Sequence, residues 1–314
     1  MKLKNIGQTD LKVAPIAFGG NVFGWTLDEK ASFEILDVFA GNEYNLIDTA
    51  NNYSYWVEGN HGGESEEIIG KWMKDRKKRH EVVIATKVGG RGENRKQTNA
   101  SRAHILAEVD ASLKRLQTDY IDLYQLHYDD LSTPIEETLS VFQELIQQGK
   151  VRWIGVSNIS AARLEESLKI SADKNLPKYQ TLQPHYNLYE SHRFEDEYQK
   201  IALDHHLDVL PYYALASGFL TGKYRSADDL SKSARGKDVE KYLNERGFKI
   251  LAALDEVSRK HGVNPAAISL AWLLHQPSIL APIASATNRQ QMETLLAAPN
   301  IHLDESDLER LKVD

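Results

Sequence analysis

Three short segments of the chain contain side chains of the types that can take part in proton transfer. The run 48–53 (DTANNY) contains Asp48 and Tyr53, while Lys87 closes the run 82–87 and His127 closes the run 121–127. A phenol near an ammonium, with a carboxylate beside that ammonium, forms a general acid whose pKa can be tuned. The sequence therefore predicts proton chemistry, provided that one fold brings these side chains together.

Parallel β-strands are the elements best suited to gather them. In each segment an apolar run stops abruptly at a polar residue, which is typical of a buried parallel strand whose carboxyl end borders a site. Eight such strands are expected, at residues 15–20, 45–48, 82–87, 121–127, 152–157, 179–183, 209–212 and 279–283.

Amphipathic helices are expected between the strands. Residues 101–116 place apolar side chains on one stripe, at Leu106, Val109, Leu113 and Leu116. Residues 133–136 (TPIE) read as a capping box, opening a helix that presents Ile135, Leu139, Phe142 and Ile146 inward and stops at Gly149.

The alternation of eight strands with helices predicts a (β/α)8 TIM barrel, in one domain covering residues 1–314. A doubly wound open sheet is the rival fold, but no G-x-G-x-x-G turn follows the first expected strand. Three segments lie outside the alternation: an N-terminal β-hairpin at 2–13, a charged insertion at 213–245 and an extra C-terminal helix at 304–311.

Composition narrows the class of protein. The chain has 314 residues, no cysteine and a net charge of −7, and 41% of its residues are hydrophobic. These values are those of a globular protein and favour neither nucleic acid nor an anionic membrane as partner. The absence of cysteine excludes disulfides and thiolate metal sites. No signal-peptide core or bilayer-length apolar run is present, so a cytoplasmic location is expected, with oligomeric state left open.

Several motifs, in order along the chain, resemble those of the aldo-keto reductases. They are DTA at 48–50 with Tyr53, ATK at 85–87, LQTDYIDLYQLH at 116–127, GKVRWIGVSN at 149–158, QPHYN at 183–187, PYYALASGFLTGKY at 211–224 and PIASATNRQQ at 282–291. The resemblance runs essentially end to end. It implies a barrel that carries out reversible hydride transfer between a carbonyl substrate and a nicotinamide cofactor.

The resemblance also implies that Asp48, Tyr53, Lys87 and His127 form the catalytic set. Tyr53 would donate the proton, Lys87 would lower the pKa of the phenol, Asp48 would keep Lys87 charged, and His127 would orient the carbonyl. Taken singly, each residue has a structural alternative, such as a helix cap, a packing residue, an ion-pair partner or a buried histidine. A metal site is not expected, because the other histidines lie elsewhere in the sequence.

Cofactor contacts are expected along the strand ends. Ser157, Asn158 and Gln183 offer donors and acceptors to the nicotinamide amide, and Tyr212 offers a ring to stack on it. The resemblance adds contacts at Gly20, Asn21, Asp48, Leu215, Ser217, Gly218 and Leu220. Where the family usually has serine and proline, this chain has Tyr213-Ala214, which predicts a bulkier loop.

The adenosine end decides between NADP and NAD. In the family, the segment after the eighth strand binds the extra phosphate of NADP. Here Ser285 and Arg289 suit that role, Thr287 stands where relatives often have a cation, and Gln291 is a candidate partner of the adenine. We expect NADPH, with NAD as the alternative cofactor.

Aromatic residues just beyond the strand ends suggest a small-molecule carbonyl substrate: Trp25, Tyr55, Trp56 and Tyr128. Sugars and aromatic aldehydes or ketones would both suit such a rim. Two other functions stay open. One is an NAD-dependent sugar dehydrogenase on the same scaffold, and the other is a cofactor-sensing subunit of a potassium channel.

Overall fold

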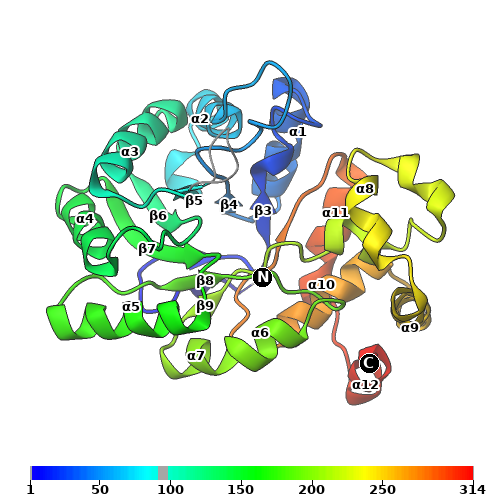
Figure 1. The fold of residues 1–314 in the computed structure, drawn as a ribbon. Coiled ribbons are helices and arrows are strands. Elements are labelled where there is room, and N and C mark those ends of the chain that lie inside the picture. The colour runs from blue at the N-terminus through cyan, green and yellow to red at the C-terminus, as the bar shows by residue number, and fades with distance from the viewer. Residues whose placement is uncertain (1, 91–97, 314) are drawn as a thin grey trace.

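A parallel β-barrel surrounded by helices forms the centre of the computed structural model, which describes residues 2–90 and 98–313 (Figure 1). Neighbouring strands follow the order β10-β3-β4-β5-β6-β7-β8-β9. Their bounds are β3 Ala17–Gly19, β4 Leu46–Asp48, β5 Val83–Val88, β6 Ile121–Leu126, β7 Val151–Ser157, β8 Thr181–Gln183, β9 Asp208–Val209 and β10 Ile283–Ala284. The predicted fold class is confirmed.

Backbone hydrogen bonds close the barrel between β9 and the segment that leads into β10. Val209 donates to Ser278 and accepts from Leu280, and Ile283 donates to Pro211. The expected eighth strand at 279–283 therefore lies in the barrel wall, although regular strand geometry is confined to β10. Short strands suffice here because each is paired on both sides.

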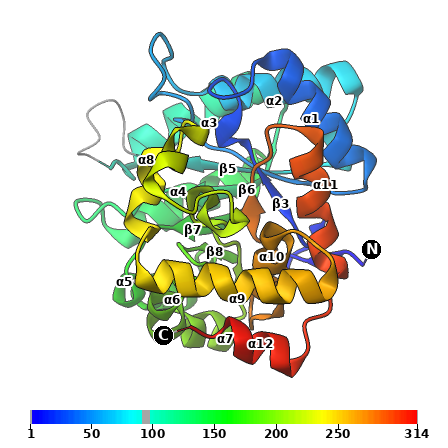
Figure 2. The same cartoon turned by 90° about the vertical axis from the view of Figure 1, so that its right-hand side faces the viewer.

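Helices cover the outside of the barrel, mostly in strand–helix alternation (Figures 1 and 2). They are α1 Glu29–Gly41, α2 Glu64–Arg76, α3 Arg102–Leu116, α4 Ile135–Gln147, α5 Ala161–Lys174, α6 His192–Glu197, α7 Gln199–Asp204, α8 Gly236–Val239, α9 Glu245–His261, α10 Pro265–His275, α11 Arg289–Ala297 and α12 Glu305–Leu311. Between β9 and β10 lie both α9 and α10, and α12 packs against α9. None of the described helices is both long and apolar enough to cross a membrane.

Apolar side chains form two layers. Inside the barrel, toward the end that the N-terminal residues cover, a small cluster includes Leu46, Val83, Leu123 and Leu210. A much larger cluster fills the space between the strands and the helices, and residues such as Trp72 and Phe142 are completely buried there. Alternation along each strand sends side chains to one layer or the other. The part of the barrel interior near the carboxyl ends of the strands is left for polar residues.

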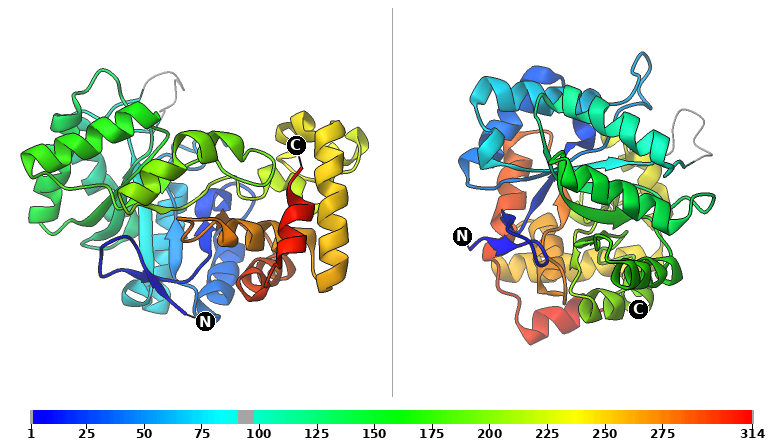
Figure 3. Two further views of the ribbon diagram at one scale, coloured as in Figure 1. Left: turned by 90° about the horizontal axis from the view of Figure 1, so that it is seen from below. Right: turned by 90° about the vertical axis from the view of Figure 1, so that its left-hand side faces the viewer.

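The N-terminal hairpin, β1 Lys4–Asn5 paired with β2 Lys12–Val13, lies at the end of the barrel opposite the strand carboxyl ends (Figure 3). Its turn is tied to the barrel by Asp10, which accepts from Arg152 at 2.6 Å and from Trp153 at 2.9 Å. Arg152 also pairs with the buried Asp122. The predicted hairpin at 2–13 thus closes one end of the barrel.

One local prediction needs correction. The capping box at 133–136 is not formed, because α4 begins at Ile135 without a side-chain cap and the hydroxyl of Thr133 donates to Asp130 instead. In the same helix Ile146 is only partly buried, and Leu145 occupies the core. Tertiary hydrogen bonding outcompetes the local cap, since Asp130 offers a charged acceptor.

Gly155 in β7 gives a test of barrel packing. A methyl group at this position would lie 2.1 Å from the hydroxyl of Thr181 and 3.2 Å from the side chain of Gln125. We expect Gly155→Ala to reduce the free energy of unfolding by about 1–3 kcal/mol, as overpacking does. Urea denaturation measures the change.

The control is Gly41→Ala at the end of α1, where the added methyl meets no atom within 4 Å. That variant should unfold at the wild-type urea concentration or slightly above it. Equal stability of both variants would contradict the tight packing around Gly155.

Candidate active site

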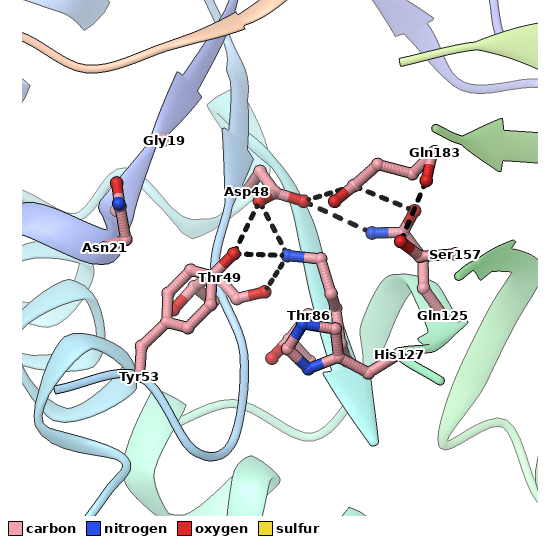
Figure 4. A network of polar contacts seen from close by, with 12 residues as sticks. Gly19, Asn21, Asp48, Thr49, Tyr53, Thr86, Gln125, His127, Ser157 and Gln183 are labelled. Carbon is pink, nitrogen blue, oxygen red and sulfur yellow. Dashed lines mark hydrogen bonds and ion pairs between the residues drawn. The ribbon is translucent and has the colours of Figure 1, made fainter. Parts of the chain in front are cut away.

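Three of the four predicted catalytic side chains form a continuous chain of polar contacts at the carboxyl ends of β4 and β5 (Figure 4). The ammonium of Lys87 donates to Asp48 Oδ2 at 2.7 Å, to the phenol oxygen of Tyr53 at 2.9 Å and to the carbonyl of Thr49 at 2.8 Å. Lys87 and Asp48 are buried, and Tyr53 reaches the surface in part. All three ammonium donors are therefore used, and they fix the phenol above the carboxylate.

The second oxygen of Asp48 is held by two amides. Gln183 donates to Oδ1 at 2.8 Å and Gln125 donates to it at 3.3 Å, while Gln183 also donates to the side-chain oxygen of Gln125 at 3.2 Å. Gln125 is the penultimate residue of β6, and the sequence prediction missed it. Its signal was a buried strand, IDLYQL, with an amide among apolar residues.

The loop that carries Tyr53 is fastened to its surroundings. The hydroxyl of Ser54 donates to the carbonyl of Phe23 at 2.6 Å, and Asn51 donates to Glu108 on α3 at 2.7 Å. The carbonyl of Tyr53 itself accepts from Gly63 at 3.1 Å. These contacts position the phenol before any substrate arrives.

The surroundings of Tyr53 oppose the lowering of its pKa by Lys87 that the sequence predicts. Burial raises the pKa of the phenol well above its ordinary value of 10.0, and the nearby Asp48 carboxylate raises it further. The Lys87 ammonium opposes this shift, because it favours the phenolate, but it is already neutralised by Asp48. Tyr53 consequently stays protonated at neutral pH, which is the form that a proton donor requires.

Burial also acts on the two basic groups. It lowers the pKa of Lys87, an effect that the Asp48 carboxylate opposes. It lowers the pKa of His127 well below 6.5, and the positive charge of Lys87 lowers it further. His127 is therefore a neutral imidazole, able to donate one hydrogen bond and to accept one.

His127 follows β6 and lies beside the phenol. Its ring centroid is 6.1 Å from that of Tyr53 and 4.9 Å from that of Tyr128. Its Nδ1 atom is buried and has no hydrogen-bond partner within the described residues. The backbone around it is held, because His127 N donates to Val88 and its carbonyl accepts from Asn158.

The residues expected around the nicotinamide amide form one cluster. Ser157 donates to the carbonyl of Gln183 at 2.8 Å and accepts from Asn158 at 3.0 Å. The phenol of Tyr212 donates to Asn158 Oδ1 at 2.9 Å. Asn158 takes a left-handed backbone conformation, with φ of 45°. The predicted set is thus together at the ends of neighbouring strands.

The segment after β9 turns sharply. Positive φ angles occur at Tyr213, Ala216, Ser217 and Gly218, at 54°, 47°, 57° and 97°. Such runs turn successive backbone N–H groups toward one side and make anion-binding hollows. The predicted cofactor residues Leu215, Ser217, Gly218 and Leu220 all belong to this segment. The bulkier residue expected there is Tyr213, whose ring is 45% exposed.

Ser285 directly follows β10 and contacts the end of the neighbouring strand β3. Its hydroxyl donates to the carbonyl of Gly19 at 2.7 Å and is 2.8 Å from the side-chain amide of Asn21. Gly20 follows directly, and a methyl group there would lie 2.9 Å from the hydroxyl of Ser65. These residues therefore form a closely packed group, called the Asn21 corner below, which consists of Gly19, Gly20, Asn21 and Ser285.

The other candidates for the adenosine end lie at the start of α11. Thr287 donates through both its backbone nitrogen and its hydroxyl to Gln291, at 2.8 and 3.0 Å. Arg289 is 76% exposed and pairs with Glu293 at 2.9 Å. Thr287, Arg289 and Gln291 thus share the edge of this corner with Ser285, but Arg289 already has an acidic partner.

Arg235 is a functional candidate that the sequence prediction missed. It lies in the insertion, far along the chain from the strand ends. With the Asn21 amide nitrogen directed at Gly19 and Ser285, the amide oxygen accepts from Arg235 at 2.5 Å. Burial lowers the pKa of this guanidinium, and no carboxylate of residues 2–90 and 98–313 forms an ion pair with it. An unpaired, partly buried cation is suited to an anionic ligand.

Aromatic side chains form the rim, as expected. Trp56 contacts both Tyr53 and Trp25, at ring separations of 6.1 and 5.7 Å, and Tyr55 lies 5.5 Å away. The Arg235 guanidinium lies 5.2 Å from the Trp25 ring. The insertion therefore contacts both Trp25 and Asn21 through one side chain.

The described part of the chain contains no group of three or more histidine, aspartate or glutamate side chains placed to hold a metal ion. The buried acid Glu66, which the sequence prediction also missed, is used structurally, because it accepts from Thr86 in β5 and from Arg115 in α3.

The chain is similar to known proteins over nearly its whole length. The sequence model of the aldo/keto reductase family matches residues 15–313. The aldo-keto reductase YhdN of Bacillus subtilis is 35% identical over 94% of this chain and 88% of its own length. A probable voltage-gated potassium channel subunit beta of Arabidopsis thaliana is 32% identical over 96% and 92%. Norsolorinic acid reductase B of Aspergillus parasiticus is 29% identical over 96% and 81%.

A family match over nearly the whole chain, together with relatives that include oxidoreductases by name, identifies the class of enzyme. The chain belongs to the aldo/keto reductase family and is an oxidoreductase.

Proposed function

We propose that this enzyme reduces aldehydes or ketones with NADPH, reversibly, with Tyr53 as the general acid and base. The observation that carries the proposal is the contact chain from Asp48 through Lys87 to Tyr53, at 2.7 and 2.9 Å. A proton donor held by a buried ion pair at the barrel mouth is what carbonyl reduction needs, since the carbonyl oxygen gains a proton when its carbon gains a hydride.

The nicotinamide cofactor supplies that hydride when bound. Tyr53 then gives its proton to the carbonyl oxygen, and the neutral His127 donates a hydrogen bond that orients the same oxygen. Lys87 limits the cost of forming the phenolate, and Asp48 limits the cost of burying Lys87. In alcohol oxidation the same groups act in reverse, with the phenolate as base.

The binding residues fit a dinucleotide. Asn158 and Gln183 present amides next to Ser157, and the phenol of Tyr212 fixes its ring beside them. The left-handed run at 216–218 suits a pyrophosphate. We assign the extra phosphate of NADP to the corner formed by Ser285 and Arg235, with Arg289 as an outer cation.

For the substrate, we propose a carbonyl compound with an aromatic or other planar apolar body. The rings of Trp25, Trp56 and Tyr128 border the approach to Tyr53, and stacking on such rings favours planar groups. A sugar would use the same rings, so an NAD-dependent sugar dehydrogenase is the enzymatic alternative. Preference for NADH over NADPH would favour it.

A channel-subunit-like role is the second candidate, because one relative at 32% identity is a probable potassium channel subunit. Such a protein would bind the cofactor tightly and turn over slowly. Steady-state turnover of a simple aromatic aldehyde with NADPH separates the two. Multiple turnovers per site support the enzyme, whereas a single slow oxidation of bound cofactor supports the sensor.

Removing the phenol hydroxyl tests the general acid. We expect Tyr53→Phe to lower kcat for aldehyde reduction by about a hundredfold or more, because proton transfer contributes on that order. Cofactor affinity, measured by quenching of tryptophan fluorescence, should stay near the wild-type value. A turnover close to wild type would rule out Tyr53 as the proton donor.

Removing the ammonium tests its coupling to the phenol. Ionising Tyr53 creates a negative charge that Lys87 stabilises, so Lys87→Met should raise the pKa of the phenol further. The rise of alcohol oxidation with pH should therefore move to higher pH. The pH–rate profile of oxidation measures this shift.

Lys71→Met is the matched control, since Lys71 forms a solvent-exposed pair with Glu29 at 2.7 Å. Its profile should be that of the wild type. Because Lys87→Met leaves Asp48 buried and uncompensated, a loss of roughly 3–5 kcal/mol in unfolding free energy is also expected. A folded, active Lys87→Met variant with an unshifted profile would contradict the coupling.

Cofactor titrations test the phosphate corner. Arg235→Ala should weaken NADPH about tenfold to a hundredfold, since charge-assisted phosphate contacts are of that strength. The loss for NADH should be smaller. Arg289→Ala should have a weaker effect on NADPH, because this guanidinium is exposed and paired with Glu293. Equal losses of NADH and NADPH in Arg235→Ala would show that Arg235 does not recognise the extra phosphate.

A further inference from the structure

His185 lies behind the predicted nicotinamide platform and has no role in the chemistry proposed above. It follows β8, paired in parallel register with Tyr212 after β9. The His185 ring stacks on the Tyr212 ring, with centroids 5.5 Å apart and planes 22° apart. It also contacts the ring of Tyr213 at 5.2 Å. The imidazole is thus part of a stack that ends at Tyr212.

Asn187 determines which ring nitrogen of the neutral His185 imidazole carries the proton. Its Oδ1 atom accepts from the backbone nitrogens of Tyr189 and Glu190, both at 2.9 Å, so the amide cannot be turned over. Its nitrogen must therefore face His185 Nε2, which lies 3.3 Å away. Since an amide nitrogen only donates, Nε2 accepts and carries no proton. Any ring proton of His185 is on Nδ1.

The same amide holds the start of the predicted cofactor loop. Asn187 donates its other hydrogen to the carbonyl of Tyr213 at 3.0 Å. Tyr213 has a left-handed backbone, which costs energy for a non-glycine residue. Asn187 is fully buried, so this contact is shielded from water. His185 and Asn187 together fix the ring of Tyr212 and the entry to residues 213–218.

We propose that His185 is a positioning residue for the cofactor, active only as the neutral Nδ1-protonated imidazole, and that its protonation weakens cofactor binding. The inference rests on the proposed function, through Tyr212 as nicotinamide platform. A proton on Nε2 would face the Asn187 amide donor, and their hydrogen bond would be lost. An imidazolium in the stack would also repel the positively charged ring of NADP⁺ more than the neutral ring of NADPH.

Charged groups around His185 come from three elements. Glu190 precedes α6, Arg193 lies on α6, and Lys241 lies on the short 3-10 helix Glu240–Tyr242, with 3.7 Å between Lys241 and Glu190. Burial lowers the pKa of His185 below 6.5; Glu190 opposes the shift, and Lys241 and Arg193 add to it. The neutral form therefore predominates at pH 7, and cofactor binding weakens only as the pH falls below 6.5.

The test compares dissociation constants of the wild type and His185→Gln, for NADP⁺ and NADPH, between pH 8 and pH 5. The glutamine oxygen can accept from Asn187 but does not titrate. The 2′-phosphate gains a proton near pH 6, and His127 is present in both proteins. Both effects cancel when the wild-type dissociation constant is divided by that of the variant.

We expect this ratio to rise about threefold to tenfold from pH 8 to pH 5 for NADP⁺, the cost of one hydrogen bond, and less for NADPH. His104→Gln, a change at a partly buried histidine on α3, is the control and should follow the wild type. A ratio that does not change with pH for NADP⁺ would overturn the proposal.

Long-range ¹⁵N correlation of the histidine rings provides a readout independent of binding. The signal absent from His185→Gln should show an unprotonated Nε2 at pH 8. A proton on Nε2 would contradict the assignment even if cofactor binding varied with pH. If the wild type bound neither cofactor at any pH, the proposed function would fail, whereas the ring assignment would still be decided by these spectra.

Discussion

An ammonium group buried in the mouth of the barrel is the constraint on which the site depends. Lys87 is fully buried, and an isolated charge in such a position costs several kcal/mol. Asp48 offsets that cost at 2.7 Å, and the carbonyl of Thr49 and the phenol of Tyr53 complete the donor set. Because all three donors are used, none of the four groups can move independently.

This requirement divides the barrel interior into two halves. The half nearer the N-terminal hairpin is apolar and is closed by that hairpin. The half nearer the strand carboxyl ends holds Asp48 together with the amides of Gln125 and Gln183, which donate to the carboxylate oxygen that Lys87 does not use. Gly155 leaves the space that the Gln125 side chain occupies. The packing of the barrel around Gln125 thus affects the Asp48 carboxylate, because moving either amide would leave Asp48 with fewer hydrogen-bond donors.

The outer parts of the site are built differently. The proposed dinucleotide site consists of backbone with left-handed residues at 216–218 and of side chains brought from distant segments. Arg235 joins the insertion to the Asn21 corner and to Trp25, and Asn187 holds Tyr213. These contacts connect segments that are not neighbours in the alternation of strands and helices along the chain. The insertion is consequently part of the site.

Much of this protein was predictable from sequence, because strand and helix periodicities are local and the polar ends of strands meet at one rim in a parallel barrel. The sequence predicted in this way that Asp48, Tyr53, Lys87 and His127 meet, and the structure brings the first three into contact with His127 beside them. The sequence did not reveal Gln125, Arg235 or the Asn187 clamp, whose roles depend on neighbours far along the chain. It predicted that Lys87 lowers the pKa of Tyr53, but not that burial and Asp48 raise this pKa. The reason is that proximity to Lys87 can be inferred from motifs, but desolvation and the competing Asp48 charge are set only when the tertiary structure excludes water.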